Sequence, residues 1–242
     1  MRNPVVNSAG QTYDRSSIEQ WLSRGNTTDP NTRQPITGQL TPNYVIKTLI
    51  NSYIPALGGK KRKNYKTMPI AQAVPTSLQD HEIINLKNKG KSLLMSKDYE
   101  LFLTSSDLIP NILTEIGRQR EIAFRAVGEG TNKPLDLDHF DNKYLHLFLW
   151  DHKACALVGA YRLGLGKQLM NAHGISGFYL SELFKFEPEI MFLFNNSIEL
   201  GRAFVCQKYQ QRPMPLFLLW KGIIHATLRY PEYDYLMGSV SI

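Results

Sequence analysis

The sequence of 242 residues contains only two cysteines and six histidines, and all of them lie after residue 77. Zinc sites need Cys or His ligands and disulfide frameworks need several cysteines, so the first 54 residues are predicted to hold neither. A long apolar run is also missing, because the most apolar stretch, Leu216 to Leu228, is interrupted by Lys221 and His225. No membrane span or signal peptide is predicted, and a cytoplasmic location is expected.

Acidic residues are absent from one short segment. The net charge of the chain is +7, and residues 55–77 contain basic residues but no acidic one. The basic cluster Lys60 to Lys63 lies among prolines and glycines, so residues 55–77 are predicted to be a linker between two domains. Nucleic acid, anionic lipid or an import receptor could bind such a cluster, but a solvated linker is favoured and a nucleic-acid partner is not expected.

The first 54 residues are predicted to form a small α+β domain. A hairpin is expected from residues 4–6 and 12–13, followed by a helix over 14–22 and a second helix over 44–54. A fold of this size buries little apolar surface and needs a further source of stability. Hydrogen bonds and ion pairs are predicted to supply it, from Asp14, Arg15, Ser17, Glu19, Asp29, Thr32 and Arg33.

Four segments of this domain carry a family resemblance. They are Asn3-Pro4-Val5-Val6, residues 10–22, residues 29–37 and Leu40-Thr41-Pro42-Asn43. Together they resemble the U-box, a zinc-free, RING-like fold in which polar contacts replace the metal. The resemblance implies a ubiquitin ligase that recruits a ubiquitin-conjugating enzyme and promotes transfer of ubiquitin to a substrate lysine, without being acylated itself.

The U-box resemblance also implies roles for single residues. Pro4, Trp21, Pro30 and Pro35 match positions that contact the conjugating enzyme, and Arg33 matches the basic residue that bridges this enzyme and ubiquitin. Such bridging restricts a flexible donor and so lowers the entropic cost of attack. The alternatives are that Trp21 and Pro35 are ordinary core and turn residues and that Arg33 is a structural ion-pair partner.

U-boxes have a further loop before the segment that matches Asn3-Pro4-Val5. Its absence from the matching part predicts either a fragment with a misplaced start or a weakened ligase.

The region 78–242 is predicted to be a second, mixed α/β domain. Residues 78–94 are weakly helical in pattern, and the helix over 216–229 is apolar almost all round, so burial on every side is expected. The other expected elements are a helix over 109–124 and strands over 144–150, 154–163, 197–205 and 235–242.

Short motifs in this region carry a second resemblance, which covers residues 95–242. They are Arg120-Glu121, residues 124–131, Asp136-Leu137-Asp138, Asp141, His146-Leu147, Trp150-Asp151, residues 158–164, Gly177-Phe178-Tyr179, residues 199–202 and residues 216–222. They resemble N-acyltransferases of the GNAT superfamily, of the hemolysin-like, ornithine-lipid type. The resemblance implies attack of an amine on an acyl thioester. It also implies further elements after Ile242, so a C-terminally truncated domain is expected.

The donor and the reacting groups follow from the same resemblance. GNAT enzymes that use coenzyme A hold its pyrophosphate on backbone N–H groups of a glycine-rich loop. Residues 210–215 stand in that place with no glycine and two prolines, so an acyl carrier protein thioester is the expected donor. Glu199 is the candidate base for the amine and Arg202 the candidate partner of an anionic group, although the two could simply pair with each other.

No metal site is expected, although His139 and His146 lie near three aspartates in the sequence, because no short His spacing repeats. Cys206 has no obvious His partner, so a nucleophilic role is not expected either.

Three interpretations of the whole chain follow. The first is a U-box ubiquitin ligase with an attached acyltransferase-like domain. The second is an N-acyltransferase that forms an acyl-amino-acid lipid and has acquired a U-box, and the third is a non-catalytic fusion remnant. The U-box motif is the sharper of the two, so the first interpretation leads. A bacterial second domain beside a eukaryotic-type U-box also predicts an effector delivered into a host cytosol.

Overall fold

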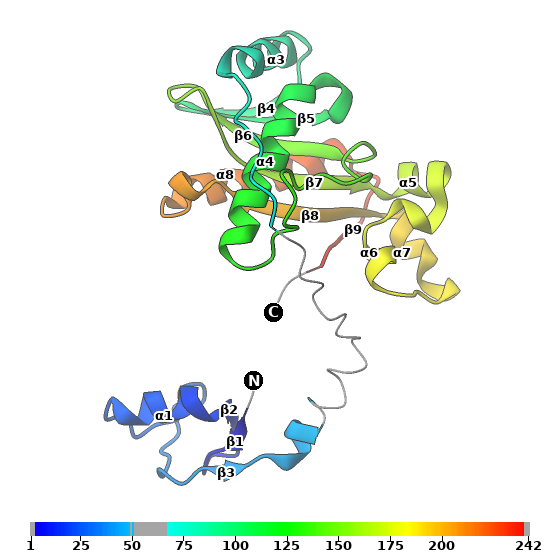
Figure 1. Ribbon diagram of the computed structural model, residues 1–242. Coiled ribbons are helices and arrows are strands. Elements are labelled where there is room, and N and C mark those ends of the chain that lie inside the picture. Colours follow the sequence, from blue (N-terminus) through cyan, green and yellow to red (C-terminus); the bar gives the residue numbers. More distant parts are fainter. Residues whose placement is uncertain (1–2, 49, 51–66, 240–242) are drawn as a thin grey trace. The chain divides into compact units, whose positions relative to one another are not determined.

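The computed structural model describes residues 3–48, residue 50 and residues 67–239, and the chain divides into two compact units after residue 65. The first unit contains the U-box-like sequence and the second contains the acyltransferase-like sequence (Figure 1). The predicted fold class, a small U-box-like α+β unit followed by a mixed α/β unit, is confirmed.

The described part of the first unit contains a three-stranded sheet, the helix α1 and a second helical stretch at residues 44–48. The strands are β1 (Pro4–Val6), β2 (Thr12–Asp14) and β3 (Thr41–Pro42), in the antiparallel order β2-β1-β3, and the helix is α1 (Arg15–Ser23). Asp14 caps α1 by accepting a hydrogen bond from the backbone N–H of Ser16. Val5 and Ile18 are almost fully buried, so the apolar core of this unit is small.

The hairpin and α1 agree with the prediction for residues 4–22. The predicted helix over 44–54 is helical at residues 44–48, and most of its remainder lies outside the described residues. The basic cluster Lys60 to Lys63 also lies outside them.

The second unit is a six-stranded sheet covered by helices on both faces. The strand order is β4-β5-β6-β7-β8-β9, with every neighbouring pair antiparallel except β8 and β9. Its strands are β4 (Ser92–Ser96), β5 (Tyr99–Ser105), β6 (Leu145–Asp151), β7 (Ala156–Leu165), β8 (Ser197–Val205) and β9 (Tyr235–Met237). Its helices are α3 (Thr76–Asn88), α4 (Pro110–Ala126), α5 (Gly166–His173), α6 (Leu180–Leu183), α7 (Met191–Asn195) and α8 (Pro213–Arg229).

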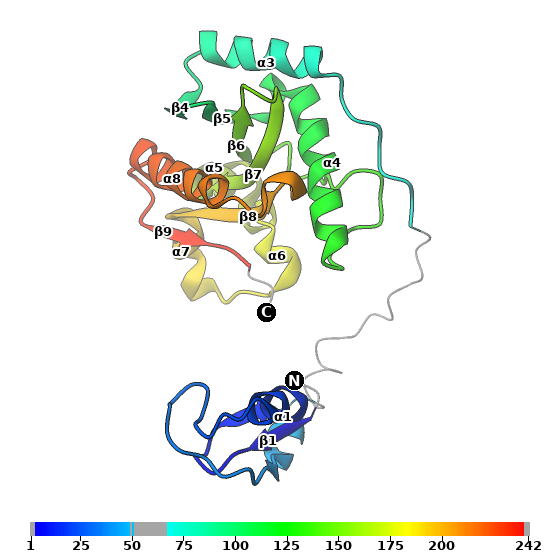
Figure 2. The ribbon, with the colours of Figure 1, turned by 90° about the vertical axis from the view of Figure 1, so that its left-hand side faces the viewer.

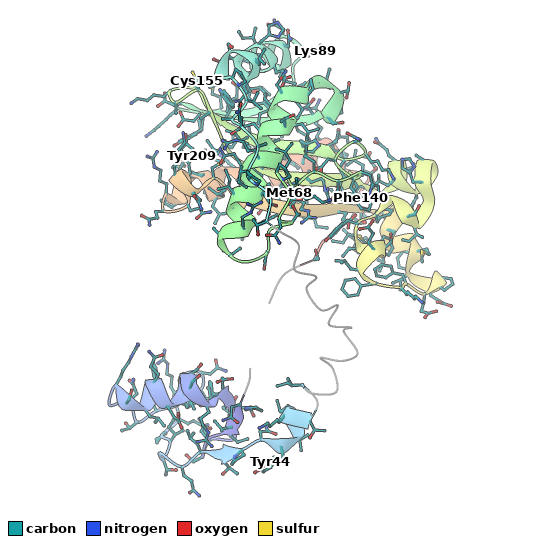
Figure 3. All side chains as sticks on the ribbon, viewed as in Figure 1. Tyr44, Met68, Lys89, Phe140, Cys155 and Tyr209 are labelled. Atoms are coloured by element: carbon teal, nitrogen blue, oxygen red, sulfur yellow. The ribbon has the colours of Figure 1, made fainter. Side chains whose placement is uncertain are left out.

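The two long helices lie on opposite faces of the sheet (Figure 2). Helix α4 packs on β7 and β8, whereas α8 crosses β5, β6 and β7. Close packing of α8 depends on Gly222, since a Cβ atom there would meet the side chain of Leu147 at 3.0 Å. A smaller cluster of aromatic side chains surrounds Phe140, which lies beside α5–α7 at one end of the sheet (Figure 3).

The predicted linker ends earlier than expected. Residues 67–77 belong to the second unit, where the N–H of Met68 donates to the carbonyl of Asn132 at 3.0 Å and the N–H of Val74 donates to the Glu115 carboxylate at 3.2 Å. Figure 3 shows Met68 beside α4. The linker boundary predicted at residue 77 is therefore wrong. Contacts between residues so far apart in the sequence cannot be inferred from composition.

Three further expectations for the second unit need correction. Residues 89–94 do not continue a helix, because β4 begins at Ser92. Strand β5 was not predicted at all. Helix α8 is not buried on every side: one of its two apolar faces is exposed.

Candidate functional sites

A buried carboxylate organises the first candidate site. Asp29 lies at the start of the loop after α1 and accepts hydrogen bonds from Asn7 Nδ2 at 2.6 Å and the Tyr13 hydroxyl at 3.0 Å. The backbone N–H groups of Asn31 and Thr32 donate to the same carboxylate at 2.9 and 2.7 Å. Burial acts to raise the pKa of Asp29, but these donors outweigh it and hold the pKa well below its usual range. The charged carboxylate therefore ties the end of β1, β2 and the loop together.

Arg33 lies in the loop that Asp29 organises. Its φ angle is 63°, an unusual value for a residue with a side chain, and its N–H donates to the carbonyl of Asp29 at 3.0 Å. A second bond, from the N–H of Asp29 to the carbonyl of Gln34 at 2.8 Å, closes the loop. The Arg33 side chain is exposed, and within the described part of the chain it forms no ion pair. The loop thus presents this cation to solvent.

Trp21 connects helix α1 to the same loop. Its indole N–H donates to the carbonyl of Thr28 at 2.8 Å, and its ring is partly exposed. Pro30 is partly exposed and Pro35 is exposed. These three residues and Arg33 belong to one helix and to the loop that the bond between Trp21 and Thr28 fastens to it.

Pro4 does not belong to that set. It is buried in β1, opposite Asp14 of β2, and its carbonyl accepts from the N–H of Asn43 at 2.8 Å. A side chain inside the unit cannot contact a partner directly, which corrects the prediction for Pro4.

The second candidate site is a network of arginines and aspartates on the α4 face of the larger sheet. Arg120 of α4 pairs with Asp141 at 2.8 Å, and Arg162 of β7 pairs with Asp138 at 2.6 Å. Arg202 of β8 lies 3.6 Å from a carboxylate oxygen of Asp138. Three elements and the segment 136–141 therefore converge on one charged cluster. Asp136 adds a third carboxylate, 3.3 Å from Arg120 and 3.6 Å from Arg202.

Most of this network is buried, but two members reach the surface. The side chains of Asp138 and Arg202 are 25% and 22% exposed, whereas those of Arg120, Arg162 and Asp141 are 1–2% exposed. Arg202 Nε and Asp136 Oδ2 are buried without a hydrogen-bond partner in the described residues. The accessible edge of the network therefore consists of the Asp138 carboxylate and the Arg202 guanidinium, whose Nε has no hydrogen-bond partner in the described residues.

Aromatic rings frame the guanidinium groups of Arg162 and Arg202. Tyr179 has the guanidinium carbon of Arg162 at 5.6 Å and that of Arg202 at 5.3 Å from its ring centre. Tyr144 lies 5.1 Å from that of Arg162. Cation–π contacts of this kind fix the orientation of the arginines.

A β-bulge sets the direction of Arg202. Ala160 pairs with Phe204 and Arg162 pairs with Gly201, so β8 has one more residue than β7 between these pairs. Arg202 takes a φ of 50° at that point. Bulges commonly re-aim a side chain beside a functional site, and here the bulge accompanies contacts of Arg202 with the acidic segment.

Glu199 lies in β8, contacts the backbone of Tyr179 and is almost completely buried. One carboxylate oxygen accepts from the N–H of Leu180 at 2.8 Å, and the other accepts from the N–H of Tyr179 and the hydroxyl of Tyr144. Burial raises the pKa of Glu199, although these three donors act in the opposite direction. Through these bonds the buried carboxylate anchors Tyr144 and the backbone of Tyr179 and Leu180. Glu199 forms no ion pair with Arg202 in the described residues. Arg202 pairs instead with Asp136 and Asp138.

The remaining titratable groups lie apart from the accessible edge. His146 is buried with a ring nitrogen 2.8 Å from the Asp141 carbonyl, and burial lowers its pKa. Burial raises the pKa of Cys206 to about 12, which is the opposite of what a nucleophilic thiol needs. His139 is exposed, 4.0 Å from Glu182. Among residues 3–48, 50 and 67–239, no three His, Cys, Asp or Glu side chains are grouped to hold a metal ion.

Sequence reasoning missed four contributors to these sites. Asn7 and Tyr13 were not expected at Asp29, and Tyr144 and Tyr179 were not expected beside the arginines. Tyr13, Arg162 and Tyr179 do occur in the motifs that carry the family resemblances. Those motifs did not show which residues they contact.

Comparison with known proteins agrees with this geometry. Residues 1–57 match the family model of the U-box domain, and residues 119–220 match that of the acetyltransferase (GNAT) domain. The chain therefore carries a region that matches the U-box, followed by a region that matches the GNAT domain.

Two kinds of relative are similar to different parts of the chain. A glycine N(alpha)-acyltransferase of Phocaeicola vulgatus is 34% identical over 154 residues, which are 59% of this chain and 47% of the relative. U-box domain-containing protein 12 of Oryza sativa subsp. japonica is 40% identical over 94 residues, 38% of this chain and 15% of the relative. The E3 ubiquitin-protein ligase SPL11 of the same plant is 48% identical over 54 residues, 22% of this chain and 8% of the relative. The chain thus spans about half of its acyltransferase relative and a small part of its U-box relatives.

Proposed function

We propose that the first unit acts as a ubiquitin-protein ligase that binds a ubiquitin-conjugating enzyme through α1 and the loop at residues 27–36. The observation that carries this proposal is the placement of Arg33, an exposed cation in a loop closed by the buried carboxylate of Asp29. In this arrangement Trp21, Pro30 and Pro35 contact the conjugating enzyme. Arg33 contacts ubiquitin and the enzyme together, which holds the thioester in a reactive orientation. Similarity to named E3 ligases supports the same function.

An autoubiquitination assay of the full chain tests this proposal. It combines ubiquitin, its activating enzyme and a panel of conjugating enzymes with the wild type, Arg33→Ala and the control Arg24→Ala. Arg24 is an exposed arginine at the C-terminal end of α1. Ladders with the wild type and Arg24→Ala support the ligase, whereas their absence with every conjugating enzyme while the unit is folded contradicts it.

As a second function we propose acyl transfer to the amine of an amino acid by the second unit, as a GNAT enzyme of the hemolysin-like, ornithine-lipid type. The specific observation is the accessible pair of Asp138 and Arg202, since an amino acid presents a cation and an anion at matching distance. Arg202 binds the carboxylate of the acceptor, and Asp138 binds its ammonium group before deprotonation. The name of the glycine N(alpha)-acyltransferase relative supports an amino-acid acceptor.

The reaction joins the acceptor nitrogen to the acyl carbon and breaks the carbon–sulfur bond of the thioester. The amine gives up one proton, and the thiol leaves with one. We propose that Glu199 is a positioning residue, because it anchors Tyr179 and Tyr144 against the arginines.

An acyl carrier protein is the donor that we propose. Helix α8 begins at Pro213, and Pro215 lies in its first turn, so two of the backbone N–H groups that would bind a pyrophosphate are missing. The phosphopantetheine arm of a carrier protein has no pyrophosphate. Acyl transfer to glycine from a carrier-protein thioester and from acyl-coenzyme A, with wild type and Arg202→Ala, tests donor and acceptor. Transfer only from coenzyme A would contradict the carrier protein, and no transfer to any amino acid would favour a non-catalytic remnant.

The pairing of relatives supports a third proposal, on location. The matched U-box relatives are plant proteins, and the matched acyltransferase relative is bacterial. A bacterial effector that is delivered into a host cytosol would explain why one chain has both kinds of relative. A reporter fusion that never enters host cells during infection by the source bacterium would contradict this proposal.

A further inference from the structure

One face of helix α8 consists of apolar side chains that touch solvent. Phe217, Trp220, Ile224 and Leu228 are 60%, 62%, 59% and 72% exposed. Their spacing of three or four residues places them in a single stripe along the helix. The opposite face packs on the sheet through Pro215, Leu218, Leu219, Gly222 and Ala226. Helix α8 is thus apolar on two faces, of which only one is covered.

The outer face is long enough to form a continuous surface. Leu216, Met214 and Pro213 extend the stripe toward the start of the helix. Soluble monomers seldom expose an apolar surface of this extent without using it.

The charge along this part of the chain has one sign. No Asp or Glu occurs from Leu200 through Pro231, whereas Lys208, Arg212, Lys221 and Arg229 do. Two of these residues precede α8 and two lie within it, the second of them at its last position. All four side chains are exposed. The next acidic residues, Glu232 and Asp234, follow the C-terminal end of the helix. A partner of this surface must therefore be apolar in its interior and negatively charged at its boundary.

We propose that the outer face of α8 docks on the surface of an anionic lipid bilayer. A helix with an apolar face flanked by Lys and Arg lies in the plane of the interface, with its apolar side chains below the headgroups. Trp220 suits that depth because an indole ring favours the boundary between headgroups and acyl chains. No helix in the described residues meets the length and hydropathy needed to cross a membrane. The proposed association is therefore peripheral, and it does not depend on acyl transfer.

Electrostatics and apolar burial act together in this proposal. Lysine and arginine near an anionic surface attract it over roughly one Debye length, about 8–10 Å at physiological salt. The apolar stripe then adds the contacts that a purely electrostatic attraction lacks. Docking is expected to need both, so neutral vesicles should bind weakly and high salt should release the protein.

Vesicle flotation with the full chain tests the proposal. The probes are vesicles of phosphatidylcholine alone and vesicles that also contain phosphatidylglycerol. The α8 variant is Ile224→Gln with Leu228→Gln, and the matched control is Leu78→Gln with Ile84→Gln on α3. Ile84 and Ile224 are 57% and 59% exposed, and Leu78 and Leu228 are 47% and 72% exposed, so the two variants make the same chemical change at exposed helix positions. The basic cluster Lys60 to Lys63 is unchanged in both.

Wild type and the α3 control are expected to float with phosphatidylglycerol vesicles and to remain unbound with phosphatidylcholine alone. The α8 variant should bind the anionic vesicles at least about tenfold more weakly than the wild type. Lys221→Glu should also weaken binding. Equal flotation of the two double variants, or no flotation of the wild type, would overturn the proposal. Light scattering that shows a dimer abolished only by the α8 variant would also overturn it, because a second copy would then cover the face.

Discussion

The backbone N–H of Arg33 donates a hydrogen bond to the carbonyl of Asp29 at 3.0 Å. The carboxylate of the same aspartate accepts from Asn7, Tyr13, Asn31 and Thr32. One residue thus closes the loop that presents Arg33 and joins that loop to the sheet. Stability of the first unit and geometry of its proposed site depend on the same buried group.

Asp29→Asn is expected to unfold the first unit. An amide has only one acceptor oxygen, so its NH2 group would face either the Asn7 amide, which donates to Oδ2, or the backbone N–H groups of Asn31 and Thr32, which donate to Oδ1. Loss of the dispersed amide NMR signals of residues 3–48, with those of the second unit retained, would show it. Glu19→Gln is the control, because Glu19 forms an exposed pair with Arg15 and should leave the spectrum native. A native spectrum for Asp29→Asn would contradict the role given to this carboxylate.

Acid should destabilise the first unit through the same group. The pKa of Asp29 is lowered on folding, so its contribution to stability is present above the usual Asp pKa of about 3.9 and is lost as the pH falls toward the folded value. Denaturant unfolding followed by NMR should show stability of this unit decreasing from about pH 4 downward. A stability independent of pH across that range would refute the prediction.

Arg120→Ala is expected to destabilise the second unit strongly. Arg120 is buried between Asp136 and Asp141, and its removal leaves carboxylates without their partner. Breaking a buried pair in this way costs about 3–5 kcal/mol. Chemical denaturation should show this loss, whereas Arg229→Ala, at an exposed helix end, should change stability by less than about 0.5 kcal/mol. Similar effects of the two substitutions would show that the network contributes little to folding.

Glu199→Gln distinguishes a positioning residue from a base. If Glu199 orients Tyr179 beside Arg202, the variant should raise KM for the amino acid and leave the shape of the pH profile unchanged. A base whose pKa is raised by burial would instead be needed in its deprotonated form, so wild-type activity would rise with pH through that pKa. Loss of that rise in Glu199→Gln, with KM unchanged, would assign proton transfer to Glu199.

Much of the fold of the first unit could be predicted because its signals are local. The hairpin follows from residues 4–13, and α1 follows from its apolar spacing and its cap at Asp14. The partners of Asp29 could not be predicted in full, since Asn7 and Tyr13 lie 22 and 16 residues before it. A sequence shows that polar groups are available, but only the fold shows which of them converge.

The second unit shows two limits of pattern reasoning. Strand β5 has buried residues on both of its faces, from Glu100 to Thr104, so it lacks the alternation that marks a half-exposed strand. Helix α8 is apolar almost all round, which predicts burial on every side, yet the sheet covers only one face. The charged network was visible as scattered motifs, and its accessible edge at Asp138 and Arg202 depends on a bulge that no local pattern revealed.

The most direct test of the central claim is single-turnover discharge of a ubiquitin-charged conjugating enzyme onto free lysine. Wild type, Arg33→Ala and Arg24→Ala are compared after NMR has shown that the first unit of each is folded. We predict that wild type and Arg24→Ala accelerate discharge equally and that Arg33→Ala loses at least about tenfold of that acceleration, the effect of removing a group that positions the donor. Equal acceleration by all three proteins, or none by the wild type, would contradict the account.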